Sequence, residues 1–131
     1  MRNVFYLIAG LLFVLLSVTH TWFGLETALP ILHGSHIDNS TIAVFTFQLH
    51  MIGIQDLFYG VAAIIMSFQR DMARVRFAAR LLTAILLGRW VIMTLVTIIY
   101  DTNNIMNLLT ASIAFLILII LLVLGAKVKN N

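Results

Sequence analysis

The amino-acid sequence predicts an all-α, four-helix transmembrane bundle that runs up, down, up and down as a single integral membrane domain. The chain has 131 residues, of which 62% are hydrophobic and only 10% are charged. A soluble domain carries about 25% charged residues, so this chain has too few to cover a surface that faces water. Four apolar runs reach the roughly 20 residues that a helix needs to cross a bilayer. The connections between them are short, which favours antiparallel neighbours.

The four predicted spans cover residues 4–25, 41–67, 77–100 and 105–126. The first resembles a signal peptide, because Arg2 precedes an apolar run. No small-x-small cleavage site follows, so we expect a spanning anchor.

The connections differ in length and character. We expect residues 26–40, which contain Pro30, to form an outer loop, and Asp38, Asn39 and Ser40 to cap the second helix. Residues 68–76 form the second connection and residues 101–104 the last.

Basic residues indicate the orientation. Seven of them fall on one side of the predicted membrane: Arg2, Arg70, Arg74, Arg76, Arg80, Lys127 and Lys129. The positive-inside rule then predicts cytoplasmic termini, with Trp22 and Tyr100 near the outer interface and Tyr6 near the inner one. The basic run 70–80 could also hold anionic lipid headgroups, although a topology signal explains it more simply. Because nothing argues for a eukaryotic secretory context, we expect a bacterial inner (plasma) membrane.

Composition also limits the chemistry. The chain has no cysteine, which excludes disulfides, thiolate metal sites and thiol redox reactions. The net charge of +3 comes from residues beside apolar spans, so we expect contact with the lipid bilayer and not with nucleic acid. The sequence contains no nucleophile elbow, phosphate loop or HExxH motif, and this favours a protein that is not an enzyme.

The second span is unusually polar for a membrane helix. It contains Gln48, His50, Gln55, Asp56 and Tyr59. Lipid offers no hydrogen bonds, so each group must find a partner inside the protein or line a wet cavity. An ionisable group at this depth is a functional-site hypothesis by default.

Two pairs of these polar groups lie at matching depths. Asp56 and Arg89 lie about 16 and 13 Å from the cytoplasmic end, and we expect them to form an ion pair. Such a pair would either clamp the helices or seat a carboxylate or phosphate. Alternatively, Arg89 could reach toward the cytoplasm and leave Asp56 protonated.

His20 and His50 both lie about 25 Å from that end. If they face each other, they could ligate a haem or a divalent metal. They could instead form hydrogen bonds with Ser17, Gln48 or a backbone carbonyl, or handle a proton or substrate.

The faces that carry these groups also contain small residues. Gly10, Ser17 and Gly24 recur on one face of the first span, and Gly53 and Gly60 lie on the face of the second span that carries Asp56. Small residues allow two helices, or a helix and a ligand, to approach closely. We therefore expect both faces to point into the protein.

The outer loop contains a second, weaker metal candidate. His33 and His36 lie near Glu26 and Asp38, and imidazole with carboxylate suits zinc or copper. Two histidines at this spacing also arise easily by chance.

Together these residues predict a ligand- or cofactor-binding site that opens outward between the first three helices. Its predicted residues are His20, His50, Asp56, Arg89, Tyr100 and Asp101. The cofactor is not identified, although haem or a divalent metal would suit the histidines. A proton-coupled or anion transporter that acts as an oligomer is one alternative, and a membrane enzyme acting on a lipid-like substrate is another. We expect a homo-oligomer or a subunit of a larger membrane complex.

Overall fold

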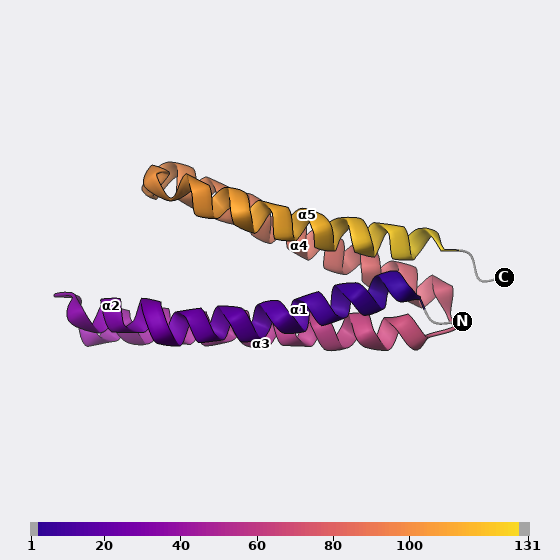
Figure 1. Cartoon of the computed structure of the whole chain (residues 1–131), viewed down its shortest axis with the longest axis horizontal. Helices are drawn as coiled ribbons and strands as arrows, with labels where there is room; N and C mark the ends of the chain where they lie inside the picture. The colour runs from indigo at the N-terminus through magenta and orange to yellow at the C-terminus, as the bar shows by residue number, and fades with distance from the viewer. Residues whose placement is uncertain (1–2, 129–131) are drawn as a thin grey trace. The chain divides into compact units, whose positions relative to one another are not determined.

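A computed structural model describes residues 3–128, and this part of the chain is almost entirely helical (Figure 1). The elements are α1 (Val4–Phe23), a π-helical turn η1 (Gly24–Ala28), α2 (Leu29–Gly34), α3 (Asn39–Phe68), α4 (Met72–Tyr100), a 3₁₀ turn η2 (Thr102–Asn104) and α5 (Ile105–Lys127). Four helical stretches are long and apolar enough to span a membrane. The predicted all-α fold is confirmed, and it is consistent with the predicted four-helix bundle.

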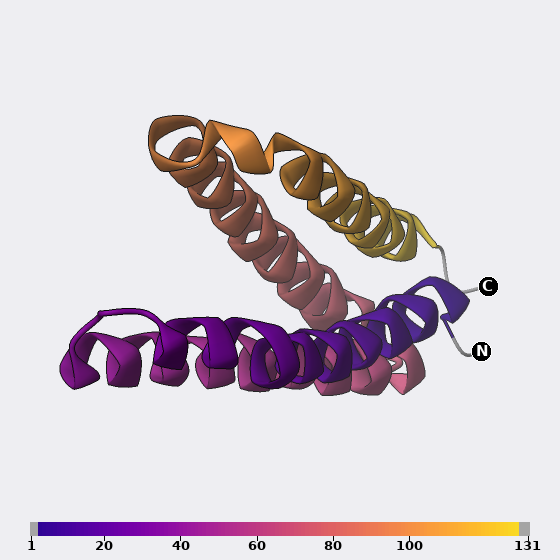
Figure 2. The same ribbon diagram turned by 60° about the vertical axis from the view of Figure 1, so that its left-hand side comes forward.

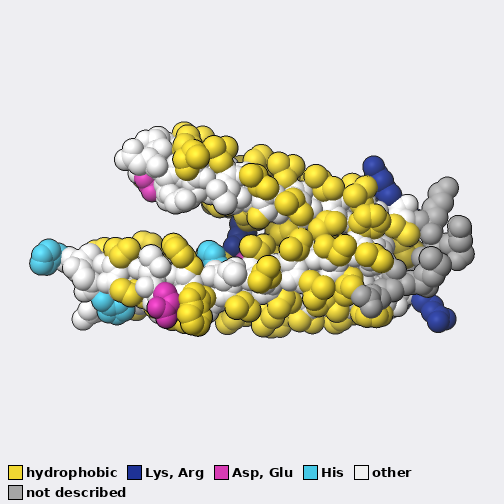
Figure 3. Space-filling view, viewed as in Figure 1, with side chains coloured by type: hydrophobic (Ala, Val, Ile, Leu, Met, Phe, Trp, Pro, Cys, Tyr) yellow, Lys and Arg dark blue, Asp and Glu magenta, His cyan; other side chains and the backbone are white. Residues whose placement is uncertain are grey.

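Most of the large hydrophobic side chains of the helices are exposed and not buried. Hydrophobic side chains cover much of the visible surface (Figure 3). In the most apolar part of each candidate span, only between 11% and 33% of the residues are buried. In water such a surface would aggregate, whereas lipid tails are as apolar as leucine and solvate it. The protein is therefore an integral membrane protein in contact with the bilayer.

The prediction of an outer loop at residues 26–40 was wrong, because the first helix continues to Gly34. Proline cannot donate a backbone hydrogen bond, and its ring clashes with the carbonyl four residues earlier in an α-helix. The π-helical turn just before Pro30 changes the hydrogen-bond spacing from four residues to five, because the N–H of Leu29 donates to the carbonyl oxygen of Gly24. Pro30 then lies in the first turn of α2, where a missing N–H is tolerated. The connection to α3 shortens to residues 35–38.

The third span also begins earlier than predicted, at Met72 instead of residue 77. The carboxylate of Asp71 accepts hydrogen bonds from the N–H groups of Ala73 and Arg74, at 3.1 and 3.2 Å. The Nε atom of Arg74 lies 3.0 Å from the same carboxylate. This acidic N-cap starts the helix within a polar segment, which a search for apolar runs overlooks.

Two compact units can be described separately. One comprises residues 10–62, and the other comprises the start of α1, the end of α3, and α4 with α5. In the first unit α1 and α3 are antiparallel and in close contact. The hydroxyl of Ser17 donates to the carbonyl oxygen of Gly53 at 2.7 Å, and a Cβ atom on Gly60 would lie 2.9 Å from the carbonyl oxygen of Gly10. The expectation that the small-residue faces point inward is confirmed here.

In the second unit α4 and α5 form an antiparallel hairpin (Figure 2). The indole Nε1 of Trp90 donates to the hydroxyl of Ser112 at 2.8 Å. Toward the other end of the hairpin, Nε of Arg76 donates to the carbonyl oxygen of Ala126 at 3.0 Å. These two interactions fix the register of the helices at points far apart along their length.

The start of α1 and the end of α3 join this hairpin at one end. The side-chain amide of Asn3 donates to the carbonyl oxygen of Gly125 at 2.9 Å. The backbone N–H of Asn3 donates to the carbonyl oxygen of Ser67 at 2.8 Å. The ring of Tyr6 packs against Gly125 and is fully buried. Tyr6 is therefore packed inside the protein, and its place near the inner interface stays a prediction. Trp22 and Tyr100 are 67% and 80% exposed, as belt residues would be.

The contact between Tyr6 and Gly125 leads to a stability prediction. A Cβ atom on Gly125 would lie 2.6 Å from a ring carbon of Tyr6, and the buried ring has little room to move. We expect Gly125→Ala to lower the free energy of unfolding by about 1–3 kcal/mol, as overpacking does. The measurement is denaturant or thermal unfolding in detergent, followed by circular dichroism.

Gly88→Ala is the matched control, because no atom lies within 4 Å of a Cβ added there. It should be neutral or stabilising by about 0.5–1 kcal/mol, since alanine favours a helix interior over glycine. Equal stability losses in the two variants would contradict the packing argument.

Candidate functional site

Asp56 is the acidic residue that the structure buries most clearly. Its side chain is 5% exposed, and it is the only acidic residue in α3. It follows Gly53 by three residues and precedes Gly60 by four, so it shares the helix face that contacts α1. One turn away, the rings of Phe13 and Tyr59 meet edge to face, with centroids 5.8 Å apart. Asp56 is therefore buried in a segment of α3 where its neighbours Gly53 and Gly60 pack closely against α1.

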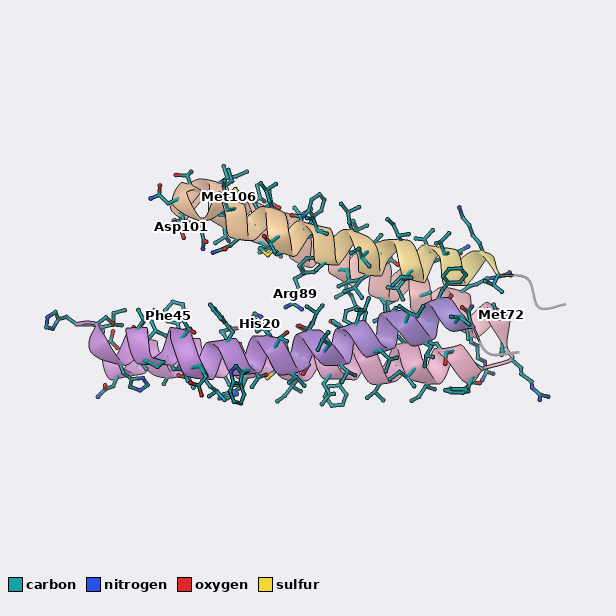
Figure 4. All side chains as sticks on the ribbon, viewed as in Figure 1. His20, Phe45, Met72, Arg89, Asp101 and Met106 are labelled. Atoms are coloured by element: carbon teal, nitrogen blue, oxygen red, sulfur yellow. The ribbon has the colours of Figure 1, made fainter. Side chains whose placement is uncertain are left out.

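Arg89 is held within the α4–α5 hairpin. Its guanidinium lies 5.6 Å from the centroid of the Phe115 ring, which is the distance of a cation–π contact. Its neighbour Trp90 is fixed by the hydrogen bond to Ser112. Figure 4 shows Arg89 on α4, about midway along the helix. Asp56 and Arg89 belong to different units, so the ion pair between them stays a prediction.

The two membrane histidines lie on the paired helices α1 and α3. His20 is half-buried and His50 is exposed (His20 is labelled in Figure 4). A Cβ atom on Gly24 would collide with Leu49, the residue before His50, so the two segments are in contact near these histidines. Ser17 donates its hydroxyl hydrogen to Gly53 and can serve a histidine only as an acceptor. Whether His20 and His50 face each other stays a prediction.

The proposed loop histidines lie at a helix end and just beyond it. Nδ1 of His33 lies 2.8 Å from the carbonyl oxygen of Leu29, so this nitrogen is the donor and Nε2 remains for other contacts. The carboxylate of Asp38 accepts hydrogen bonds from the backbone and side chain of Thr41 and from the hydroxyl of Ser40. Asp38 therefore caps α3, which confirms it among the predicted caps.

Within residues 3–128, no group of three or more histidine, aspartate or glutamate side chains is placed to hold a metal ion. A metal site at His33 and His36 would need further ligands from elsewhere. It stays a prediction.

Tyr100 and Asp101 end α4 at the turn into α5. The backbone N–H of Asp101 donates to the carbonyl oxygen of Thr97, and its carbonyl accepts from the N–H of Asn104, both at 3.0 Å. Asp101 is labelled at this turn in Figure 4. Its backbone closes the turn, while its exposed carboxylate makes no capping hydrogen bond to the 3₁₀ turn that follows.

The sequence did not predict a cavity of about 380 Å³ between α4 and α5. It lies toward the start of α4 and the end of α5, and Arg80 and Lys127 are among its lining residues. Lys127 was assigned only to membrane topology, and Arg80 was assigned to topology or, with the basic run 70–80, to anionic lipid headgroups. The clustering of basic residues at helix ends was a visible signal, but their sharing of one groove depends on how the two helices rotate.

Comparison of the chain with family models, with curated proteins and with solved structures finds no match.

The cap at Asp38 leads to a pH prediction. Hydrogen bonds from Ser40 and Thr41 hold the pKa of this carboxyl well below its usual range. A lowered pKa in the folded state means that the cap contributes stability above the ordinary carboxyl pKa of about 4. That contribution is lost as the pH falls through the lowered value. At neutral pH we expect Asp38→Ala to speed hydrogen exchange at the amide of Thr41, as measured by NMR.

Asp101→Ala is the control for this experiment, because that carboxylate makes no capping hydrogen bond. It should leave exchange at Thr41 unchanged. Unaltered exchange in Asp38→Ala would contradict a capping role.

Proposed function

We propose that the protein binds a small ligand or cofactor at a polar site within the membrane. The observation that carries the proposal is the burial of Asp56 in a helix that can span a bilayer. A carboxylate at the middle of a membrane helix costs about 2.5–3.5 kcal/mol on insertion scales. The contact between α1 and α3 is already closed by glycine packing and by the bond from Ser17 to Gly53. Packing of these two helices alone therefore does not account for a carboxyl group at position 56.

Arg89 supplies the complementary chemistry in this proposal. A guanidinium carries its N–H donors in one plane, in a fork that matches a carboxylate or phosphate. It can bind either group with two parallel hydrogen bonds. The cation–π contact of Arg89 with Phe115 supports a defined position for such a donor. Asp56 would either pair with Arg89 or accept a cationic group of the ligand.

His20 and His50 form the outer wall of the proposed site, with Tyr100 and Asp101 at its rim. The cofactor version of the proposal places a haem or a divalent metal between the histidines, since neutral imidazole is a common ligand for both. The contact of Gly24 with Leu49 supports it, because it brings the helices together near these residues. We further propose a bacterial inner membrane with cytoplasmic termini, and assembly as an oligomer or within a larger complex.

A spectrum and metal analysis of the purified protein test the cofactor version. We expect a Soret band or a bound metal that is lost in His20→Ala and in His50→Ala. His36→Ala separates this site from the weaker candidate at His33 and His36, because a cofactor held by His20 and His50 should be retained in it. Protein that is colourless and free of metal after purification from haem-replete, metal-replete cells would overturn this version.

The ligand version has a separate test. Native mass spectrometry of the wild-type protein should detect a co-purified small molecule that is lost in Asp56→Asn and Arg89→Gln and kept in Asp71→Asn, because Asp71 is exposed and lies outside the proposed site. The same mass in all four proteins would contradict the proposed site.

Proton-coupled transport is a second candidate, and the burial of Asp56 favours it as well. Acidic residues inside membrane spans form the proton relays of pumps and transporters. In proteoliposomes with a pH-sensitive dye, we expect proton flux that is abolished in Asp56→Asn. The exposed carboxyl of Asp71, outside the proposed site, provides the control, and Asp71→Asn should retain the flux. Equal flux in wild type and Asp56→Asn would exclude Asp56 as the proton carrier.

A further inference from the structure

The cavity between α4 and α5 combines two cations with an apolar trough. Its volume is about 380 Å³, and both helices contribute to its walls. Arg80 lies near the start of α4, and Lys127 is the last residue of α5. Because the two helices are antiparallel, both cations lie at the same end of the groove. Toward the other end the lining becomes apolar, with Ala84, Leu87 and Val123.

The cations of this groove have no acidic counterpart in its walls. All five acidic residues of the chain lie in the part that the structure describes, and none of them lines the cavity. The acidic residue nearest in sequence to Arg80, Asp71, is occupied by its contacts with Arg74 and with the start of α4. The groove therefore presents a net charge of +2 from its own lining residues, Arg80 and Lys127.

The remaining polar group in the groove is already satisfied. The hydroxyl of Thr83 donates to the carbonyl oxygen of Ala79 at 2.8 Å, within α4. From Arg80 to Leu87 the groove follows about 10 Å of helix, which is roughly two turns. The result is an amphipathic trough with a positive head and an apolar tail, set into helices that span the membrane.

We propose that this groove binds an anionic phospholipid. Its phosphate lies between the guanidinium of Arg80 and the ammonium of Lys127, and one acyl chain follows the apolar trough between α4 and α5. Arginine and lysine both donate to phosphate oxygens, and basic pockets between membrane helices suit anionic headgroups. A free phosphate would satisfy the cations but would leave the trough without an occupant. The amphipathic lining thus favours a lipid over a soluble anion.

Native mass spectrometry of the full chain, from nanodiscs containing phosphatidylglycerol and phosphatidylcholine, tests the headgroup contact. We expect the wild type to retain phosphatidylglycerol in preference to phosphatidylcholine. The double variant Arg80→Gln/Lys127→Gln should lower that preference by about fivefold for each charge removed. Arg74→Gln is the control, because it removes one charge from a residue that pairs with Asp71 and does not line the groove. It should keep the preference.

A second pair of variants tests the trough. Ala84→Trp would fill its apolar part, whereas Leu81→Trp places the same side chain at an exposed position outside the lining. We expect lipid retention to be lost in the first variant and kept in the second, with both proteins monodisperse and helical. If Ala84→Trp does not fold, the charge variants alone decide the proposal.

Three results would overturn the proposal. Equal retention of the two lipids by the wild type would show that the groove does not select an anionic headgroup. An equal loss for each charge removed in Arg74→Gln and in the double variant would indicate general surface charge. Displacement of the lipid by millimolar inorganic phosphate would show that the site takes a soluble anion instead.

Discussion

At the end of α5, backbone carbonyls that are left free as the helix ends accept hydrogen bonds from other parts of the chain. Asn3 donates to the carbonyl of Gly125, and Arg76 donates to that of Ala126. The last carbonyls of any helix lack a partner within the helix, and lipid cannot supply one. The need to satisfy such groups ties the start of α1 and the start of α4 to the end of α5. Tyr6 can pack so closely there only because residue 125 has no side chain.

The same constraint shapes the contact between α1 and α3. Without a hydrophobic driving force between helices in lipid, association depends on close packing and on interhelical hydrogen bonds. Gly60 packs closely against Gly10, and the hydroxyl of Ser17 forms an interhelical hydrogen bond with the carbonyl oxygen of Gly53. Asp56 follows the same helical register, on a face that the neighbouring helix covers. A polar group in this position is shielded from lipid, which allows a membrane helix to carry it.

The two ligand sites that we propose differ in how the unfavourable energy of a charge in the membrane is reduced. Asp56 and Arg89 lie far from the helix ends, where a charge must be shielded by protein or neutralised. Arg80 and Lys127 lie near helix ends, where long side chains can reach the headgroup region. The first pair suits a specific ligand within the membrane. The second suits the lipid that surrounds the protein.

The sequence alone was sufficient for the fold class, because lipid selects for composition and length more than for detailed contacts. The four apolar runs became the four long helices, and the small residues around Ser17 and Gly53 marked the faces that pack together. Local chemistry was also readable where a side chain acts on its own backbone, as Asp38 does at the start of α3. The helix ends were less predictable. Pro30 is a helix breaker by propensity, yet a π-helical turn accommodates it.

Tertiary structure alone decided what each buried or paired side chain does. Tyr6 has the position of an interfacial residue in the sequence, and only its contact with Gly125 makes it part of the core. Arg80 and Lys127 are 47 positions apart, and the antiparallel pairing of α4 with α5 brings them into one groove. Periodicity defines which residues share a helix face. It leaves open how far each helix rotates about its axis, and that rotation determines which faces meet.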